Sequence, residues 1–75
     1  MYSITVPEPN SGKTLLEFLE VIAETDGFLQ KFAAGFRQES CIVMLDNKII
    51  PSPAQSSTIV NAGQSVKVFP LVFGG

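Results

Sequence analysis

The sequence predicts an α+β fold in which one main helix packs on one face of a small mixed sheet. Three observations support this prediction: an alternating apolar segment near the start, an amphipathic segment after it, and two strand-like apolar runs in the second half. The resulting order is strand, helix, strand, short strand, strand, which is typical of a helix covering one side of a sheet. We expect one domain over residues 1–71 and a flexible tail over residues 72–75.

The first strand is expected over residues 2–6, where Tyr2, Ile4 and Val6 alternate with two hydroxyl side chains. Such alternation is typical of a strand with one buried face. Pro7 and Pro9 should end this strand, and a polar loop leads from there to the helix.

The main helix is predicted to begin after Thr14 and to run to about Thr25. Thr14 and Glu17 form a capping box, in which each side chain accepts a hydrogen bond from the other residue's amide. The apolar residues recur with helical spacing: Leu15, Phe18, Leu19, Ile22 and Ala23. We expect a stop at Asp26-Gly27 and a second short helix over residues 28–34.

The second half is predicted to supply the rest of the sheet. Residues 41–45 are apolar on both faces, as in a central strand, and residues 49–50 form a short return strand after a turn. A polar loop is expected over residues 52–57, a single turn over residues 58–60 and a tight turn over residues 61–64.

The last strand is expected to show different residues on its two faces. Val66 and Val68 should face the helix, whereas Lys67 marks the opposite, wet face. An apolar row follows on that wet face: Phe69, Leu71 and Phe73. Such a row indicates a docking surface, unless the N-terminal segment or residues 28–36 cover it.

Two further features belong to the end of this strand. Pro70 has no amide hydrogen, so regular pairing should weaken there. The chain should be free from about Val72, and it ends in Gly74-Gly75. A glycine pair adds no packing, but its thin backbone can enter a narrow active site and present the Gly75 carboxylate as the reacting group. The other interpretation is a frayed end.

Composition excludes several functions. The net charge is −2 and the five basic residues are scattered, which argues against a nucleic-acid partner. The apolar runs are too short to cross a membrane. Without histidine, and with one cysteine, the chain has no Ser-His or Cys-His pair and no usual zinc site, so we expect neither a metal site nor an autonomous enzyme. One cysteine makes no internal disulfide, and the expected location is the cytoplasm.

Two local patterns have a structural and a functional interpretation. Gly12-Lys13-Thr14 follows a strand and opens a helix, as a nucleotide-binding loop does. That loop needs a glycine at the position of Pro7, which has no amide to offer a phosphate. We therefore interpret Thr14 as a helix cap. Asp46 follows the apolar run of residues 41–45, as a magnesium-holding aspartate does in nucleotide-binding proteins, but we interpret it as a turn residue. Cys41 lies in an apolar strand, where we expect a small buried side chain with a raised thiol pKa.

Three segments of the chain resemble the ThiS/MoaD family of sulfur carrier proteins, which share the ubiquitin-like β-grasp fold. They are the helix entry at residues 12–15, the strand, turn and return strand at residues 43–51, and the closing pattern at residues 60–75. The third segment matches from Gly63 to Gly75 without a gap. In place of the family's usual acidic turn the chain has Ala62-Gly63-Gln64. A β-grasp begins with a hairpin, and the few residues before Gly12 make that hairpin short or incomplete.

The resemblance implies a carrier cycle. A partner enzyme would use ATP and magnesium to adenylate the Gly75 carboxylate, and a sulfur donor would convert it to a thiocarboxylate for an acceptor synthase. This chain itself would bind no cofactor. Gly74 would permit close approach in the partner's channel, and the partner-binding residues would be Phe69, Pro70, Leu71, Val72 and Phe73.

The resemblance leaves the destination of the sulfur open among thiamin, molybdopterin and amino-acid biosynthesis. The Phe69-Pro70 pair favours the molybdopterin type, and residues 47–51 favour the thiamin type. Two other functions also fit the sequence. One is a ubiquitin-like modifier joined to a target lysine through Gly75, and the other is a non-catalytic β-grasp binding module.

Overall fold

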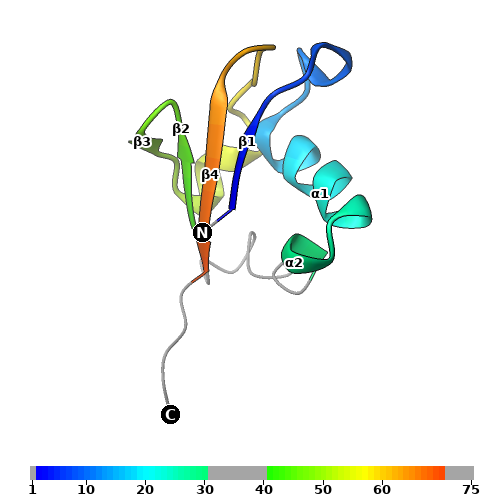
Figure 1. Ribbon diagram of the computed structural model, residues 1–75. Coiled ribbons are helices and arrows are strands. Elements are labelled where there is room, and N and C mark those ends of the chain that lie inside the picture. The colour runs from blue at the N-terminus through cyan, green and yellow to red at the C-terminus, as the bar shows by residue number, and fades with distance from the viewer. Residues whose placement is uncertain (1, 31–40, 71–75) are drawn as a thin grey trace.

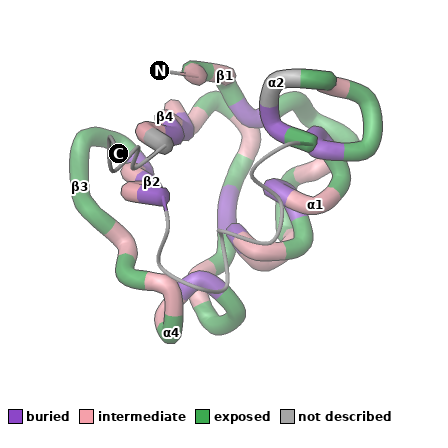
Figure 2. Tube along the Cα trace, turned by 90° about the horizontal axis from the view of Figure 1, so that it is seen from below, coloured by how far each residue is buried: buried purple, intermediate pink, exposed green. Residues whose placement is uncertain are grey.

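A computed structural model describes residues 2–30 and 41–70 of the 75-residue chain (Figure 1). The N-terminal elements are β1 Tyr2–Thr5, the 3-10 helix η1 Glu8–Asn10, α1 Leu15–Thr25 and α2 Gly27–Gln30. The C-terminal elements are β2 Cys41–Leu45, β3 Lys48–Ile49, α4 Ser52–Gln55 and β4 Ser65–Pro70. Viewed from below, the strands form one layer and α1 lies against it as a second layer (Figure 2). The predicted α+β arrangement is therefore confirmed.

Within the described residues, four strands lie in the order β1-β4-β2-β3, so β4 is internal to the sheet. All three pairings are antiparallel: β1 with β4, β4 with β2, and β2 with β3. The expectation of a mixed sheet was wrong in this respect.

The reason lies at the N-terminus. Within the described residues a single strand, β1, precedes α1 in the sheet, so the expected short or incomplete hairpin has no second strand there. Strand β1 and strand β2 run the same way, with α1 returning between them, and β4 occupies the space between the two (Figure 1). A hairpin would have added one reversal of direction before the helix. Its absence leaves β1 antiparallel to β4.

The core lies between α1 and the sheet. The predicted apolar face of α1 is buried as expected, and Phe18 and Leu19 have no exposed surface. From the sheet, Val43, Val66 and Val68 meet this face with at most 1% exposure. This confirms that Val66 and Val68 face the helix. Because side chains alternate along a strand, their neighbours point to the other side of the sheet.

The main helix begins where the capping box predicts. The Thr14 hydroxyl accepts a hydrogen bond from the Glu17 amide at 3.1 Å, and the Glu17 carboxylate accepts one from the Thr14 amide at 3.0 Å. Asp26 ends α1 and its carboxylate accepts a bond from the Leu29 amide at 3.2 Å, so it also starts α2. Helix α2 begins at Gly27, one residue before the expected start, and its expected extension to residue 34 lies outside the described residues.

The substitution Thr14→Ala is expected to lower the free energy of unfolding by about 1 kcal/mol, because it removes the cap of the only long helix described. Chemical denaturation monitored by circular dichroism measures this change. Ser3→Ala, at an exposed position of β1, is the matched control and should leave stability nearly unchanged. Equal stability of the two variants would show that the capping box contributes little.

Two predictions for the second half were wrong. Residues 52–55 form helix α4 in place of a polar loop. Pro51 precedes the helix with an extended conformation, and a proline also lies in its first turn, where a missing amide costs nothing. Gln55 is 1% exposed and its amide donates to the Ile50 carbonyl at 3.3 Å, so this turn is fixed by a buried contact that periodicity does not reveal.

Residues 58–60 are extended and do not form the expected single turn. Ile59 pairs with Thr14 in an antiparallel bridge, and the amides of Leu15 and Val60 complete it by donating to Thr58 and Lys13 at 2.7 and 2.9 Å. The segment just before α1 thus pairs with residues far along the chain. This pairing replaces the missing second strand as a support for the helix entry.

Candidate functional site

Strand β4 places the C-terminal tail. It is hydrogen-bonded to β1 on one edge and β2 on the other, and it ends at Pro70 beside the beginning of β1 (Figure 1). The predicted reacting and partner-binding residues after it lie outside the described residues: Leu71, Val72, Phe73, Gly74 and Gly75. The same holds for the predicted boundary between domain and tail. What the structure gives is the position of the last described residue before the tail, at the end of an internal strand of the sheet.

Pairing continues to the last residue of β4, where Cys41 lies opposite Pro70. The expected weakening of the pairing at Pro70 is therefore not observed within the described residues. Just beyond the other end of this ladder, the Asp46 amide nitrogen donates to the Ser65 carbonyl oxygen at 2.8 Å, so Asp46 and Ser65 are a hydrogen-bonded pair. Along an antiparallel ladder, hydrogen-bonded pairs alternate with pairs that are not hydrogen-bonded. By this alternation the Cys41–Pro70 pair exchanges none. Proline fits here because β2 needs no amide from it.

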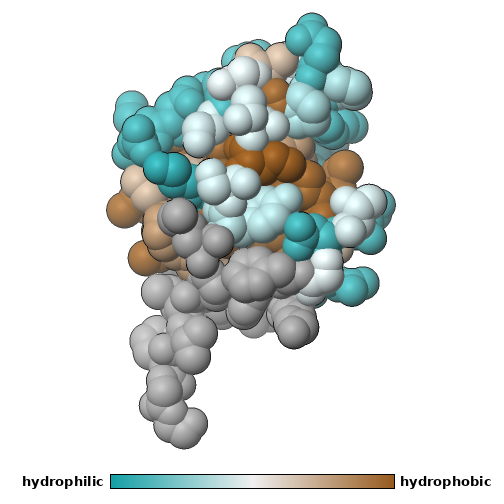
Figure 3. Space-filling model, viewed as in Figure 1, coloured by the Kyte–Doolittle hydropathy of each residue, from teal (hydrophilic) through white to brown (hydrophobic). Residues whose placement is uncertain are grey.

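The sheet has an apolar patch on its outer face, the face turned away from α1. Phe69 lies on this face, as predicted, opposite Ile42 of β2. Met44 and Ile49 extend the patch toward the edge of the sheet, and Ile49 is 60% exposed. In Figure 3, brown apolar atoms reach the surface on the left edge of the view, the side on which β2 and β3 lie.

Sequence analysis missed this extension of the patch. It described residues 41–45 as apolar on both faces, as in a central strand, but did not place Ile42 and Met44, which are half-buried on the outer face. The missing signal was the register of β2 against β4, which sets Ile42 beside Phe69 and Met44 beside Lys67. Because residues directly opposite share a face, strand pairing brings together what the sequence separates.

A polar network holds the two turns at the other end of the sheet. Asp46 and Asn47 form the β2–β3 turn with positive φ angles of 49° and 66°, as short hairpin turns require. The Asp46 carboxylate accepts from the Ser65 amide and from the Gln64 side chain, each at 2.9 Å. The ThiS/MoaD pattern usually has an acidic residue at the position of Gln64, and its carboxylate would face the carboxylate of Asp46. Gln64 instead donates a hydrogen bond to Asp46.

This network is expected to make the stability of the fold depend on pH. The backbone amide of Ser65, and then the Gln64 side chain, hold the pKa of Asp46 below its ordinary value of 3.8. A pKa lowered by folding means that the ionised form is favoured in the folded state, so the contribution is present above the unfolded pKa and lost as pH falls through the folded one. We expect wild type to lose more stability than Asp46→Asn between pH 7 and about pH 3. Denaturation curves at both pH values measure this, and parallel losses would contradict it.

Comparison with known proteins decides the family. The sequence profile of the ThiS family matches residues 3–75, nearly the whole chain. The chain belongs to the ThiS family. The fold is accordingly a ubiquitin-like β-grasp, here with an antiparallel sheet. No curated protein and no solved structure gave a significant match.

Proteins of the ThiS family are small sulfur carriers, not catalysts, and they work with partner enzymes. Within residues 2–30 and 41–70 no cluster of side chains has the composition of a metal site. In the same ranges, no helix has the length and apolar character needed to cross a membrane.

The helix entry of this ThiS family protein is occupied by its own chain. The amides of Gly12 and Leu15 donate to Val60 and Thr58, and the Thr14 amide donates to Glu17. Phosphate binding at a glycine loop needs free amides, so these contacts argue against the nucleotide-binding interpretation. They support the alternative, in which Thr14 is a helix cap.

Cys41 of this ThiS family protein has the environment of a structural residue. It is 7% exposed, and burial raises the pKa of its thiol above the ordinary value. A raised pKa keeps the thiol protonated and unreactive near neutral pH. The structural interpretation of Cys41 from the sequence is therefore supported.

Proposed function

We propose that this chain carries sulfur as a thiocarboxylate on Gly75. The carboxylate oxygen attacks the α-phosphorus of ATP in a partner enzyme, which forms an acyl-adenylate and releases pyrophosphate. Hydrosulfide supplied by the sulfur donor then attacks the acyl carbon, the acyl–phosphate bond breaks and AMP leaves, so one carboxylate oxygen is replaced by sulfur. The observation that carries this proposal is the ThiS family match, which extends through Gly74 and Gly75.

The fold supports the proposal through the origin of the tail. Strand β4 is held by backbone pairing on both edges, which fixes the point from which Leu71 and the following residues leave. A tethered sulfur atom gains effective concentration at the acceptor's site, because the carrier's docking replaces a free encounter. The two glycines add no side chains, so the reacting carbonyl can enter a narrow channel.

The partners we propose are an adenylating enzyme that uses ATP and magnesium, a sulfur donor, and an acceptor synthase in thiamin, molybdopterin or amino-acid biosynthesis. The chain itself binds none of these cofactors in this scheme. We place the reaction in the cytoplasm, where ATP is abundant. Phe69 on the outer face, together with the row Leu71 and Phe73, is the proposed contact surface.

The test is the intact mass of the chain after incubation with ATP, magnesium, a sulfur donor and a lysate of its host. We expect a gain of about 16 Da at Gly75, the replacement of one oxygen by sulfur. A lysate that thiocarboxylates a control carrier but leaves this chain at its encoded mass would contradict the proposal. An isopeptide between Gly75 and a lysine would instead identify a protein modifier.

A further inference from the structure

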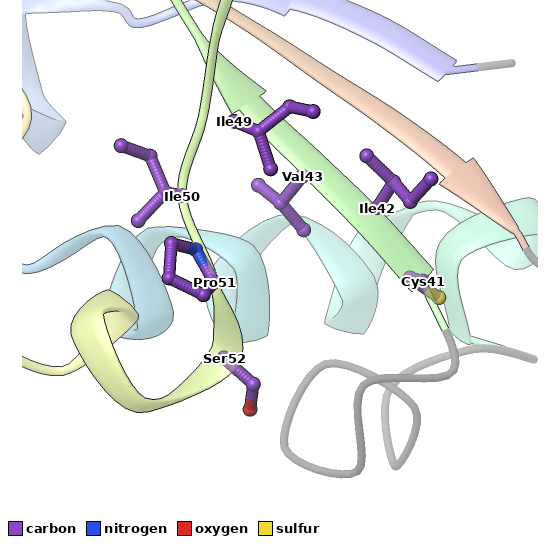
Figure 4. Close-up of a pocket in the computed structure, with 7 residues that line it drawn as sticks. All are labelled: Cys41, Ile42, Val43, Ile49, Ile50, Pro51 and Ser52. Atoms are coloured by element: carbon purple, nitrogen blue, oxygen red, sulfur yellow. The ribbon is translucent and has the colours of Figure 1, made fainter.

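An apolar groove opens between β2 and the segment that follows β3. Its volume is about 220 Å³, and one wall is formed by β2 residues and the other by residues 49–52 (Figure 4). The two walls are joined by the Ile50 amide, which donates to the Val43 carbonyl at 2.8 Å. Beyond this bond Pro51 has no amide to donate and α4 begins, so the chain leaves β2 and the groove opens.

The groove lies close to the origin of the tail. Cys41 lines the groove and is also the residue opposite Pro70, the last residue of β4. Neighbouring strands are about 4.8 Å apart, which places the groove about 10 Å from the point where the tail begins. Any enzyme that encloses the tail at its base therefore comes within reach of the groove.

The groove is continuous with the apolar patch of the outer face. Ile42 and Ile49 belong to both, and Ile42 lies beside Phe69. Figure 4 shows these two isoleucines on opposite walls of the groove. A partner that docks on Phe69 can thus insert a side chain between Ile42 and Ile49.

The charge on the outer face of the sheet indicates which charged group a partner carries beside its apolar side chain. Among the outward-facing residues of the four described strands, Lys67 alone is charged, and its ammonium donates to the neutral side-chain oxygen of Asn47 at 3.2 Å. The exposed face of α1 carries glutamates instead, at positions 17, 20 and 24. An acidic group on the partner is therefore complementary to the outer face and is repelled by the helix face.

We propose that the groove is the anchor site of the adenylating enzyme. It takes one aliphatic or aromatic side chain from the enzyme's surface, and a neighbouring carboxylate of the enzyme faces Lys67. This inference rests on the proposed function, because it assigns the groove to the enzyme that activates Gly75. A buried apolar anchor in a pocket, surrounded by a polar rim, is the usual source of affinity in protein interfaces.

The test compares Ile49→Asp with Ile59→Asp in pyrophosphate exchange by the adenylating enzyme of the same organism. Both isoleucines are exposed, at 60% and 49%, so both variants should fold. Ile49 lines the groove, whereas Ile59 pairs with Thr14 at the helix entry. We expect Ile49→Asp to raise KM for the carrier at least about tenfold with kcat little changed, and Ile59→Asp to match wild type.

Ile49→Ser, read in the same assay, guards against a folding defect in Ile49→Asp and should raise KM by a smaller factor. Lys67→Gln should also raise KM, and this increase should shrink at high salt, where the wild-type charge is screened. If Ile49→Asp and Ile49→Ser have the same KM for the carrier as Ile59→Asp, the groove is not the anchor, although the proposed function stands. If the wild-type chain itself gives no exchange, both proposals are overturned.

Discussion

Removal of Gly74 and Gly75 is expected to abolish adenylation and thiocarboxylate formation completely. The truncated chain keeps every contact of the described core, because β4 and its pairing with β1 and β2 end before the deletion. What it loses is the extension that brings a carboxylate to the partner's nucleotide, and a reacting group displaced by two residues is out of register with the site. The measurement is intact mass after the sulfur-transfer reaction, together with thermal unfolding of the same sample.

The expected outcome for this deletion is an unchanged melting temperature and no gain in mass. Gly75→Ala provides an intermediate case: it retains the terminal carboxylate but adds a methyl group where close approach is required, so the rate should fall without reaching zero. A truncated chain that still gains sulfur would show that the tail is not the site. A binding module with an incidental tail would keep its partner after the deletion.

Phe18→Ala is expected to destabilise the protein by about 3–5 kcal/mol, because a fully buried ring is removed from the centre of the core. A core of this size supplies only about 3–5 kcal/mol in total, so the variant should be largely unfolded at room temperature. Chemical denaturation monitored by circular dichroism measures the loss. Phe18 of α1 belongs to the same buried cluster as Val43 and Val68 of the sheet, so its removal affects the core shared by both layers.

Val21→Ala is the control for this substitution. Val21 lies on the same helix but is 37% exposed, so its truncation should change stability by no more than about 0.5 kcal/mol. If Phe18→Ala and Val21→Ala unfold at the same denaturant concentration, the assigned core is wrong. Phe18→Ala and the deletion of Gly74 and Gly75 also separate two routes to lost function, since Phe18→Ala acts through the fold and the deletion acts through the tail alone.

The elements that sequence analysis predicted correctly are those with a local cause. Helix α1 begins at the capping box of Thr14 and Glu17 because both hydrogen bonds join residues three apart in the chain. The β2–β3 turn follows from Asp46 and Asn47, which tolerate positive φ angles. The helix-facing side of β4 follows from the alternation of Val66 and Val68 with Lys67.

The elements that were predicted wrongly depend on distant contacts. Residues 58–60 form a very short segment, and they are extended because they pair with the helix entry more than forty residues earlier. Helix α4 is a single turn whose Gln55 side chain is buried against Ile50, which no periodicity over four residues can indicate. The direction of β1 relative to β4 likewise depends on how many strands precede α1.

The candidate site divides in the same way. By itself the sequence determined the family pattern, the Gly74-Gly75 ending and the outward position of Phe69, because these are matters of residue type and alternation. Only the tertiary structure placed Ile42 beside Phe69 and Ile49 beside Met44, and opened the groove that Ile42 and Ile49 line. The physical reason is that register between strands is set by the packing of the whole sheet on α1, and a shift of one residue would turn each of these side chains to the other face.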